Sequence, residues 1–197
     1  MSEKTEQKRQ LILESARQVF VDRGYKAVTM KDIVEASGIS RGGLYLYFSS
    51  VEEVFLAVVE MEDTRVDVEI TGEQLAGVTD AELLVFFLKT QKKEILRKKG
   101  SLMVAKYEYA FEHSKDKEKT EFLRKEVDKE IYVLRQILER GTKEGDFYCD
   151  RPRDMAREMV YVIEGLKIIA CTIGIGERRI DRAFMKMVEE LTELRYS

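Results

Sequence analysis

The segment from Thr29 to Phe48, TMKDIVEASGISRGGLYLYF, contains two helix starts separated by a glycine-bearing break. Thr29 is followed three residues later by Asp32, which predicts a capped helix start because the threonine oxygen can accept a free backbone N–H. In the break ASGIS, Gly38 permits a positive φ and Ser40 can cap the next helix. The segment therefore predicts a short helix, a tight turn and a second short helix, which restricts the fold more than any other part of the chain.

Helices are also predicted on both sides of this segment. Residues 7–23 carry apolar side chains at helical spacing, and Gly24 follows as a stop. Ser50 with Glu53 predicts the start of a long helix that reaches to about residue 70. Further helices are predicted over about 79–99, 101–113, 115–145, 153–173 and 178–195.

The composition agrees with an all-α fold. The 197-residue chain has a single proline, Pro152, and many residues that lose little rotamer freedom in a helix. We expect two domains, a helix-turn-helix domain over 1–50 and a helical domain over 51–197, with a linking helix over about 51–70.

Charge and residue counts exclude several classes of function. The formal net charge is −3, and residues 1–50 hold eight Lys/Arg against six Asp/Glu, hence +2, which leaves −5 for the rest. One histidine and two cysteines without CxxC spacing, expected to be reduced, leave little for a zinc site or a His-dependent triad. We therefore expect no enzyme activity, no catalytic or metal site and no cofactor. The polar N-terminus and the lack of a long apolar run predict a cytoplasmic protein without a membrane partner.

The predicted helix over 41–48 has an unusual outer face. Leu44 and Phe48 form its buried edge, so Gly42, Gly43 and Leu46 point the other way. Two glycines in an exposed helix cost on the order of 2 kcal/mol relative to alanine. Either the helix tolerates this cost, or a partner such as DNA must approach the backbone closely. If DNA approaches here, Gly43→Leu should keep the fold and lose specific DNA binding.

Thr29, the ASGIS break, the GxLYxYF run and the following EEVF closely resemble the DNA-binding domain of the TetR (tetracycline-repressor) family of bacterial transcriptional regulators. The resemblance is strong over about residues 8–60 and architectural beyond them. It implies that Arg41 reads a base edge, guanine being the commonest partner of arginine. The tyrosines of this segment either contact the DNA backbone or pack between helices. The implied DNA-binding residues are Thr29, Lys31, Arg41, Gly42, Gly43, Tyr45, Leu46 and Tyr47.

One position departs from the family pattern. Val51 stands where the family usually has a lysine at the start of the fourth helix, so an expected phosphate anchor is missing. Affinity for DNA is then expected to depend on Lys31, Arg41, helix N-termini and the pair Lys8 and Arg9.

For the second domain, the resemblance implies a small-molecule cavity and a two-fold dimer interface. Aromatic residues here either form an ordinary core or line that cavity, which is expected to be largely apolar with a few polar groups. The candidate ligand-binding residues are Phe86, Tyr107, Glu108, Phe111, Phe122 and Tyr161. The candidate interface residues are Val160, Ile163, Ile169, Phe184, Met187, Val188 and Leu191.

These expectations combine into one functional hypothesis. The chain is expected to be a homodimeric repressor that binds a palindromic double-stranded DNA operator and is released by a small molecule. The alternative is a ligand-independent DNA-binding or adaptor protein. Repression and activation are not distinguished by sequence, because polarity depends on where the operator lies.

Overall fold

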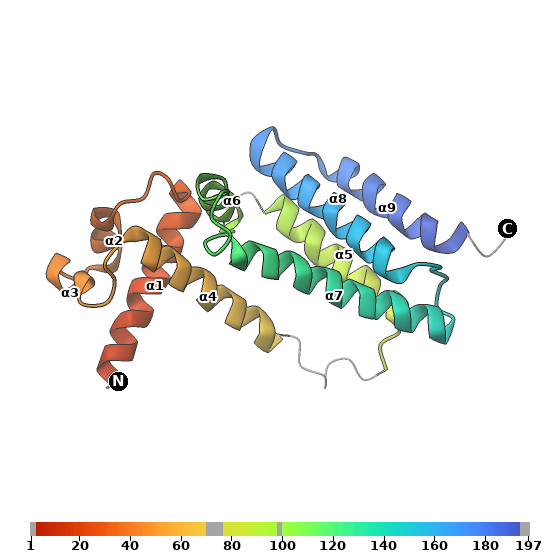
Figure 1. Cartoon of the computed structure of the whole chain (residues 1–197), viewed down its shortest axis with the longest axis horizontal. Coiled ribbons are helices and arrows are strands. Elements are labelled where there is room, and N and C mark those ends of the chain that lie inside the picture. Colours follow the sequence, from red (N-terminus) through yellow and green to blue (C-terminus); the bar gives the residue numbers. More distant parts are fainter. Residues whose placement is uncertain (1–2, 70–76, 98–99, 194–197) are drawn as a thin grey trace. The chain divides into compact units, whose positions relative to one another are not determined.

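The computed structural model describes residues 3–69, 77–97 and 100–193, with side chains over 3–62, 77–97 and 100–191. Within these residues every regular element is a helix, which confirms the predicted all-α fold (Figure 1). The helices form two compact units, one containing α1 to α4 and α6, the other α5 and α7 to α9. Helix α6 thus belongs to the first unit, although the helices before and after it in sequence belong to the second. The functional division at residue 50 stays a prediction.

The first unit is organised around its N-terminal helix, which packs against α2, α4 and α6. Ile12, Ala16 and Phe20 of α1 are fully buried, as their helical spacing predicts. Gly24 ends this helix at φ +74°, a conformation that suits a residue without a side chain. The helices are α1 Glu3–Arg23, α2 Met30–Ser37, α3 Arg41–Tyr45, α4 Val51–Glu69 and α6 Met103–Glu112.

The second unit is a bundle in which α5 and α8 both pack against α7, and α9 packs against α5. Figure 1 shows these helices running alongside one another. Thr79 and Glu82 form the predicted capping box at the start of α5, and Pro152 occupies the first turn of α8. The helices are α5 Asp80–Leu96, α7 Glu121–Glu144, α8 Pro152–Thr172 and α9 Glu177–Glu193.

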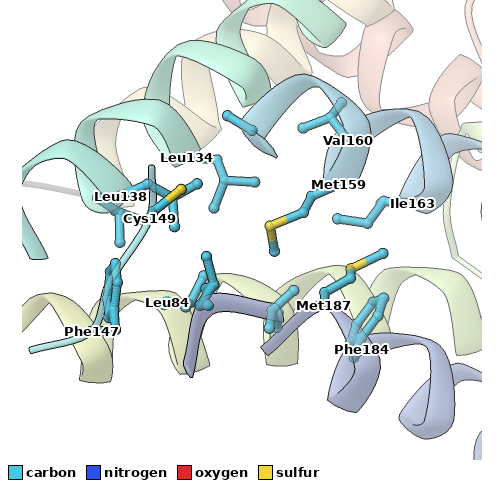
Figure 2. Close-up of a cluster of buried hydrophobic side chains, with 14 of the residues drawn as sticks. Leu84, Leu134, Leu138, Phe147, Cys149, Met159, Val160, Ile163, Phe184 and Met187 are labelled. Atoms are coloured by element: carbon cyan, nitrogen blue, oxygen red, sulfur yellow. The ribbon is translucent and has the colours of Figure 1, made fainter. Parts of the chain in front are cut away.

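All four helices of the bundle contribute to one apolar core. Figure 2 shows Leu84 of α5, Leu134 of α7, Met159 of α8 and Phe184 of α9 directed toward one another. Met159 is 1% exposed and Leu134 is fully buried. The predicted ends of several segments lie outside the described residues: position 70 of the linking helix, the loop over 71–76, positions 98–99, and positions 194–195 of the last helix.

Candidate nucleic-acid interface

Helix α2 is fixed at both ends by the contacts that its sequence predicts. Thr29 Oγ1 accepts the Asp32 N–H at 3.3 Å, and the Asp32 carboxylate accepts the Thr29 N–H at 2.8 Å. The Asp32 carboxylate also pairs with Arg23 at the end of α1. The bonds from Thr29, together with Arg23, lower the pKa of Asp32 and keep it ionised. At the other end Gly38 has φ +67° and donates its N–H to Val34 O at 3.0 Å.

Helix α3 buries one face and leaves the other open. Leu44 is fully buried and Phe48 is 3% exposed, as predicted. The helix itself ends at Tyr45, earlier than the predicted end at residue 48. Leu46 is 85% exposed and Tyr45 is 45% exposed. Helix α3 and the Leu46 that directly follows it therefore present an exposed apolar and aromatic surface on the helix after the turn, the helix that enters the major groove in helix-turn-helix proteins.

The charged candidates lie on the same two helices. The Arg41 guanidinium lies 5.8 Å from the centre of the Tyr45 ring. The Lys31 side chain is 83% exposed and its ammonium is 3.7 Å from Glu35. Most of the predicted DNA-binding residues are exposed, namely Thr29, Lys31, Arg41, Gly42, Tyr45 and Leu46, whereas Gly43 and Tyr47 are half-buried.

The two adjacent glycines differ in their surroundings. A Cβ on Gly42 would meet no atom within 4 Å, so this backbone is open to an approaching partner. A Cβ on Gly43 would lie 2.9 Å from Ile39 Cγ2 and 3.1 Å from Ser40 Oγ. Ser40 Oγ also caps α3 by accepting the Gly43 N–H at 3.2 Å. A side chain at Gly43 would therefore require Ile39 and Ser40 to shift, and the effect of Gly43→Leu on the fold and on DNA binding stays a prediction.

Helix α4 begins beside α3 with a capping arrangement that differs by one residue from the prediction. Ser50 Oγ accepts the Glu53 N–H at 3.1 Å, as expected. The Glu53 carboxylate, however, accepts the Ser49 N–H at 2.6 Å and the Ser49 hydroxyl at 2.8 Å. These bonds lower the pKa of Glu53. Val51 at the first helical position is half-buried and offers no charge to a phosphate.

Glu108 of α6, a candidate ligand-binding residue, instead holds the turn that follows α1. Its Oε2 accepts the backbone N–H of Tyr25 at 2.7 Å and that of Lys26 at 3.0 Å. The fit is close, because a Cβ on Gly24 would lie 2.5 Å from the same oxygen. We call this arrangement the Glu108 clamp. It fixes the chain between α1 and α2 from a position 82 and 83 residues away in sequence.

Two further contacts bind the helices of the first unit together. Arg17 of α1 donates to both Glu62 carboxylate oxygens, at 2.7 and 3.1 Å, and to Gly100 O at 3.2 Å. The buried Tyr109 of α6 donates its hydroxyl to Glu52 of α4 at 2.8 Å. The sequence analysis singled out the neighbouring Tyr107 and missed Tyr109. The helical period could have found Tyr109, since it shares a buried face with the fully packed Ala105.

Tyr109 belongs to an aromatic cluster in the first unit. Its ring centroid lies 4.9 Å from that of Tyr25 and 5.0 Å from that of Phe55, and Phe55 contacts Phe20 at 5.1 Å. Burial, with the nearby carboxylates of Glu52 and Glu112, raises the pKa of Tyr25 to about 12. The cluster therefore packs aromatic side chains of α1, α4 and α6 together, and the Tyr25 hydroxyl within it stays protonated.

The predicted ligand-binding residues fall in different units. Tyr107, Glu108 and Phe111 lie on α6 in the first unit, whereas Phe86, Phe122 and Tyr161 lie on helices of the second. Phe86, Phe111 and Tyr161 are 62%, 65% and 58% exposed, so they are not core aromatics of the chain. Tyr107 and Phe122 are half-buried.

Most of the predicted dimer residues pack inside the protomer. Five are buried in the core of the second unit: Val160, Ile163, Phe184, Met187 and Leu191. Val188 is half-buried against that core, and Ile169 is 38% exposed. Side chains that fill the protomer's own core are not free to form an interface. The apolar surface of these helices is provided instead by Tyr161, Val162, Ile168, Ile169, Ile173 and Met185.

Comparison with known proteins connects this geometry to a family. The family model for bacterial regulatory proteins of the tetR family matches residues 12–58, and that for the tetracyclin repressor-like C-terminal domain matches residues 83–181. The chain belongs to the TetR family of transcriptional regulators. Its regulators bind DNA operators and function as dimers, and they are not enzymes.

Individual TetR-family relatives match most of the chain. The uncharacterised HTH-type transcriptional regulator YfiR of Bacillus subtilis is 30% identical over 143 residues, which is 72% of this chain and 68% of that protein. HTH-type transcriptional regulator QacR of Staphylococcus aureus is 25% identical over 167 residues, 85% and 88% of the two chains. A TetR-family regulator from Agrobacterium tumefaciens has the same fold, with a TM-score of 0.77, 19% identity and coverage of 95% and 99%.

Other kinds of site are poorly supported in the described part of the chain. No group of three or more His, Cys, Asp or Glu side chains in it is placed to hold a metal ion. Cys149 and Cys171 are free thiols whose pKa is raised by burial, which makes them poor nucleophiles. Among the described helices, none combines the length and apolar character that a membrane span requires.

Proposed function

We propose that this TetR-family regulator is a dimeric repressor that binds a palindromic operator and releases it when a largely apolar small molecule binds the second unit. The observation that carries the proposal is the open face of α3, where Arg41, Tyr45 and the 85%-exposed Leu46 surround the unobstructed backbone of Gly42. An arginine supplies paired donors for a base edge, and apolar atoms suit a thymine methyl group.

A dimer follows from the size of this surface. One recognition helix contacts only a few base pairs, so two of them, spaced by about 34–36 Å or a multiple, are needed to read a palindrome. Helix α8 supports such pairing, because Tyr161, Ile169 and Ile173 are 58%, 38% and 85% exposed and lie on or directly after it. Covering these side chains removes apolar area from water.

The link between ligand and operator runs, in this proposal, through α6 as well as α4. The chain enters α6 from α5 and leaves it toward α7, and both of those helices belong to the second unit. A rearrangement of α5 and α7 therefore acts on α6, whose Glu108 clamp holds the turn before α2. Ligand and operator then favour different arrangements, and each lowers the affinity for the other.

Operator binding can be tested by fluorescence anisotropy with duplexes tiled across the region upstream of the gene, at two salt concentrations and beside shuffled duplexes. We expect tight binding to one palindromic tile, with affinity that falls as salt rises because phosphate contacts release counterions. Gly42→Leu should retain the fold and lose this binding, since its side chain would extend into open space where DNA approaches. Gly176→Leu, at a glycine of the second unit that is equally unobstructed, is the control.

Two results would contradict the proposal. Equal, weak binding to every tile would indicate a DNA-binding protein without operator preference in this region. Wild-type affinity of the Gly42→Leu variant would show that DNA does not approach α3 at this point.

A further inference from the structure

The recognition segment, defined as residues 41–50, offers no positive charge on the side that leads into α4. After Arg41 the sequence contains no Lys, Arg or His before Arg65, and the first turn of α4 instead carries Glu52 and Glu53. A helix in the major groove has a phosphate backbone on each side of it. A phosphate beside the start of α4 would therefore meet no cation from the recognition segment itself.

A hollow beside the start of α4 brings in a lysine from another element. The hollow has a volume of about 490 Å³ and lies within the first unit. Val51 is the first residue of α4, and Val28 directly precedes Thr29, the N-cap of α2. The hollow therefore borders the starts of the two helices that flank α3 in sequence. The residues that line it are Tyr25, Lys26, Val28, Val51 and Glu112.

Lys26 has an ammonium group without an internal partner. Among the described residues its side chain forms no ion pair, although Glu112 lines the same hollow. Arg17 and Arg23 of the same unit, by contrast, are paired with carboxylates. The Lys26 backbone N–H is held by the Glu108 clamp at 3.0 Å, and the residue itself is exposed. Lys26 can therefore bind a phosphate without giving up another charged partner.

The walls of the hollow suit a lysine side chain that reaches toward α4. Val28 is 7% exposed and Val51 is half-buried, so apolar atoms line the hollow between the turn after α1 and the start of α4. A lysine stem packs along such atoms while its ammonium stays in water. The carboxylate of Glu112 disfavours a phosphate at its own wall, which leaves the side of Val51 as the better place for one.

We propose that Lys26 binds the DNA phosphate beside the start of α4 and supplies the positive charge that the recognition segment lacks there. The inference rests on the proposed function, because it assigns a contact in the same protein–DNA complex. An ammonium meets a phosphate as a point charge and distinguishes no base, so Lys26 contributes affinity and position rather than sequence preference. Because the Glu108 clamp fixes the Lys26 backbone, the clamp also positions this phosphate contact.

The test is the salt dependence of DNA binding by the full-length protein, measured by fluorescence anisotropy for wild type and Lys26→Gln. The probes are the upstream tile that binds most tightly and a shuffled duplex of the same length. We expect the slope of log K against log salt concentration to become shallower by about 0.9 per protomer, or about 1.8 for the proposed dimer, because fewer counterions are released. Affinity should fall about tenfold on both duplexes, since a phosphate contact carries no sequence information.

A second substitution locates the phosphate. Val51→Lys in the Lys26→Gln background should restore most of the lost slope, because both positions border the same hollow. Lys143→Gln, at an exposed position on α7 of the second unit, is the matched control and should leave the slope unchanged. If Lys26→Gln lowers the slope and Val51→Lys does not restore it, the phosphate lies elsewhere and its assignment to the start of α4 is overturned.

The slope also separates this inference from a structural role and from the proposed function. An unchanged slope in Lys26→Gln overturns the Lys26 contact, even if the melting temperature falls, because a merely structural lysine releases no counterions. Tight binding of the wild type to one tile, with that unchanged slope, would support the operator and contradict the Lys26 contact. Equal binding to every tile, with a slope that still falls in Lys26→Gln, would contradict the operator and support the contact, since non-specific binding depends on phosphates too.

Discussion

Removing the Glu108 carboxylate should weaken the DNA-binding unit although Glu108 lies on none of its recognition helices. In Glu108→Ala, the N–H groups of Tyr25 and Lys26 lose a charged acceptor at 2.7 and 3.0 Å. A hydrogen bond to a charged group contributes about 1.5–3 kcal/mol. Because the Lys26 bond is exposed and water replaces it, we expect a total loss of about 2–3 kcal/mol in the free energy of unfolding.

The assay combines calorimetry with amide hydrogen exchange. For a chain of this size, about 2–4 °C of melting temperature is lost per kcal/mol, so the melting temperature of the protein should fall by about 4–12 °C. Exchange at the Tyr25 and Lys26 amides should accelerate selectively. Glu112→Ala is the matched control, since Glu112 is exposed on the same helix α6, and it should leave both readings almost unchanged.

A double-mutant cycle with Gly24 can refute the reasoning. Gly24→Ala alone carries two costs, the positive φ of +74° and a Cβ only 2.5 Å from Glu108 Oε2. In the Glu108→Ala background the second cost disappears, so the two losses of stability should sum to more than the loss of the double variant. Additivity within about 0.5 kcal/mol would mean that the clamp does not hold this turn.

Three further predictions concern other parts of the chain. The pKa of Asp32 is lowered in the folded state, so its contribution to stability is present above the ordinary aspartate pKa of about 3.9 and is lost as pH falls through the folded value. The stability of Asp32→Asn, followed by acid titration, should therefore depend less on pH in that range. Gly141→Ala should destabilise α7 by about 1–3 kcal/mol, despite its better helix propensity, because the new Cβ would meet Phe147 at 2.3 Å; Phe147→Leu should relieve part of this loss in chemical denaturation. Ile173→Lys, at an 85%-exposed position, should keep the fold and shift the protein toward monomer in analytical ultracentrifugation.

Local sequence signals predicted most of the helix boundaries. Capping boxes at Thr29 and Thr79 occur in the structure as read from spacing alone, and Gly24 and Gly38 adopt the positive φ expected of them. These features depend on residues within one helical turn of each other, so the information lies in the local sequence. The capping arrangement at Glu53 shows the limit, because its contacts are divided between two adjacent serines: Ser50 Oγ accepts the Glu53 N–H, whereas Ser49 donates to the Glu53 carboxylate.

Long-range packing was not predictable in the same way. The apolar stripes of α8 and α9 show which side chains are buried, but periodicity does not reveal whether the protomer or a partner covers them. Val160 and Phe184 consequently appeared as interface candidates and lie in the core. Glu108 appeared as a polar group for a ligand, because its backbone partners are far away in sequence. A sequence shows that a carboxylate is present without showing which amide it reaches.

The strength of the Glu108 clamp suits a contact that can break and re-form better than a permanent one. Two charge-assisted hydrogen bonds, one of them exposed to water, hold the turn with about 2–3 kcal/mol, and the coupling free energy between two ligand sites is typically about 1–3 kcal/mol. A fully buried ion pair at this place would resist separation, since each charge would need a new partner. The backbone N–H groups of Tyr25 and Lys26 can instead turn to water when α6 moves. In the proposed mechanism, the clamp is thus strong enough to order the DNA-binding turn and weak enough for a bound effector to release it.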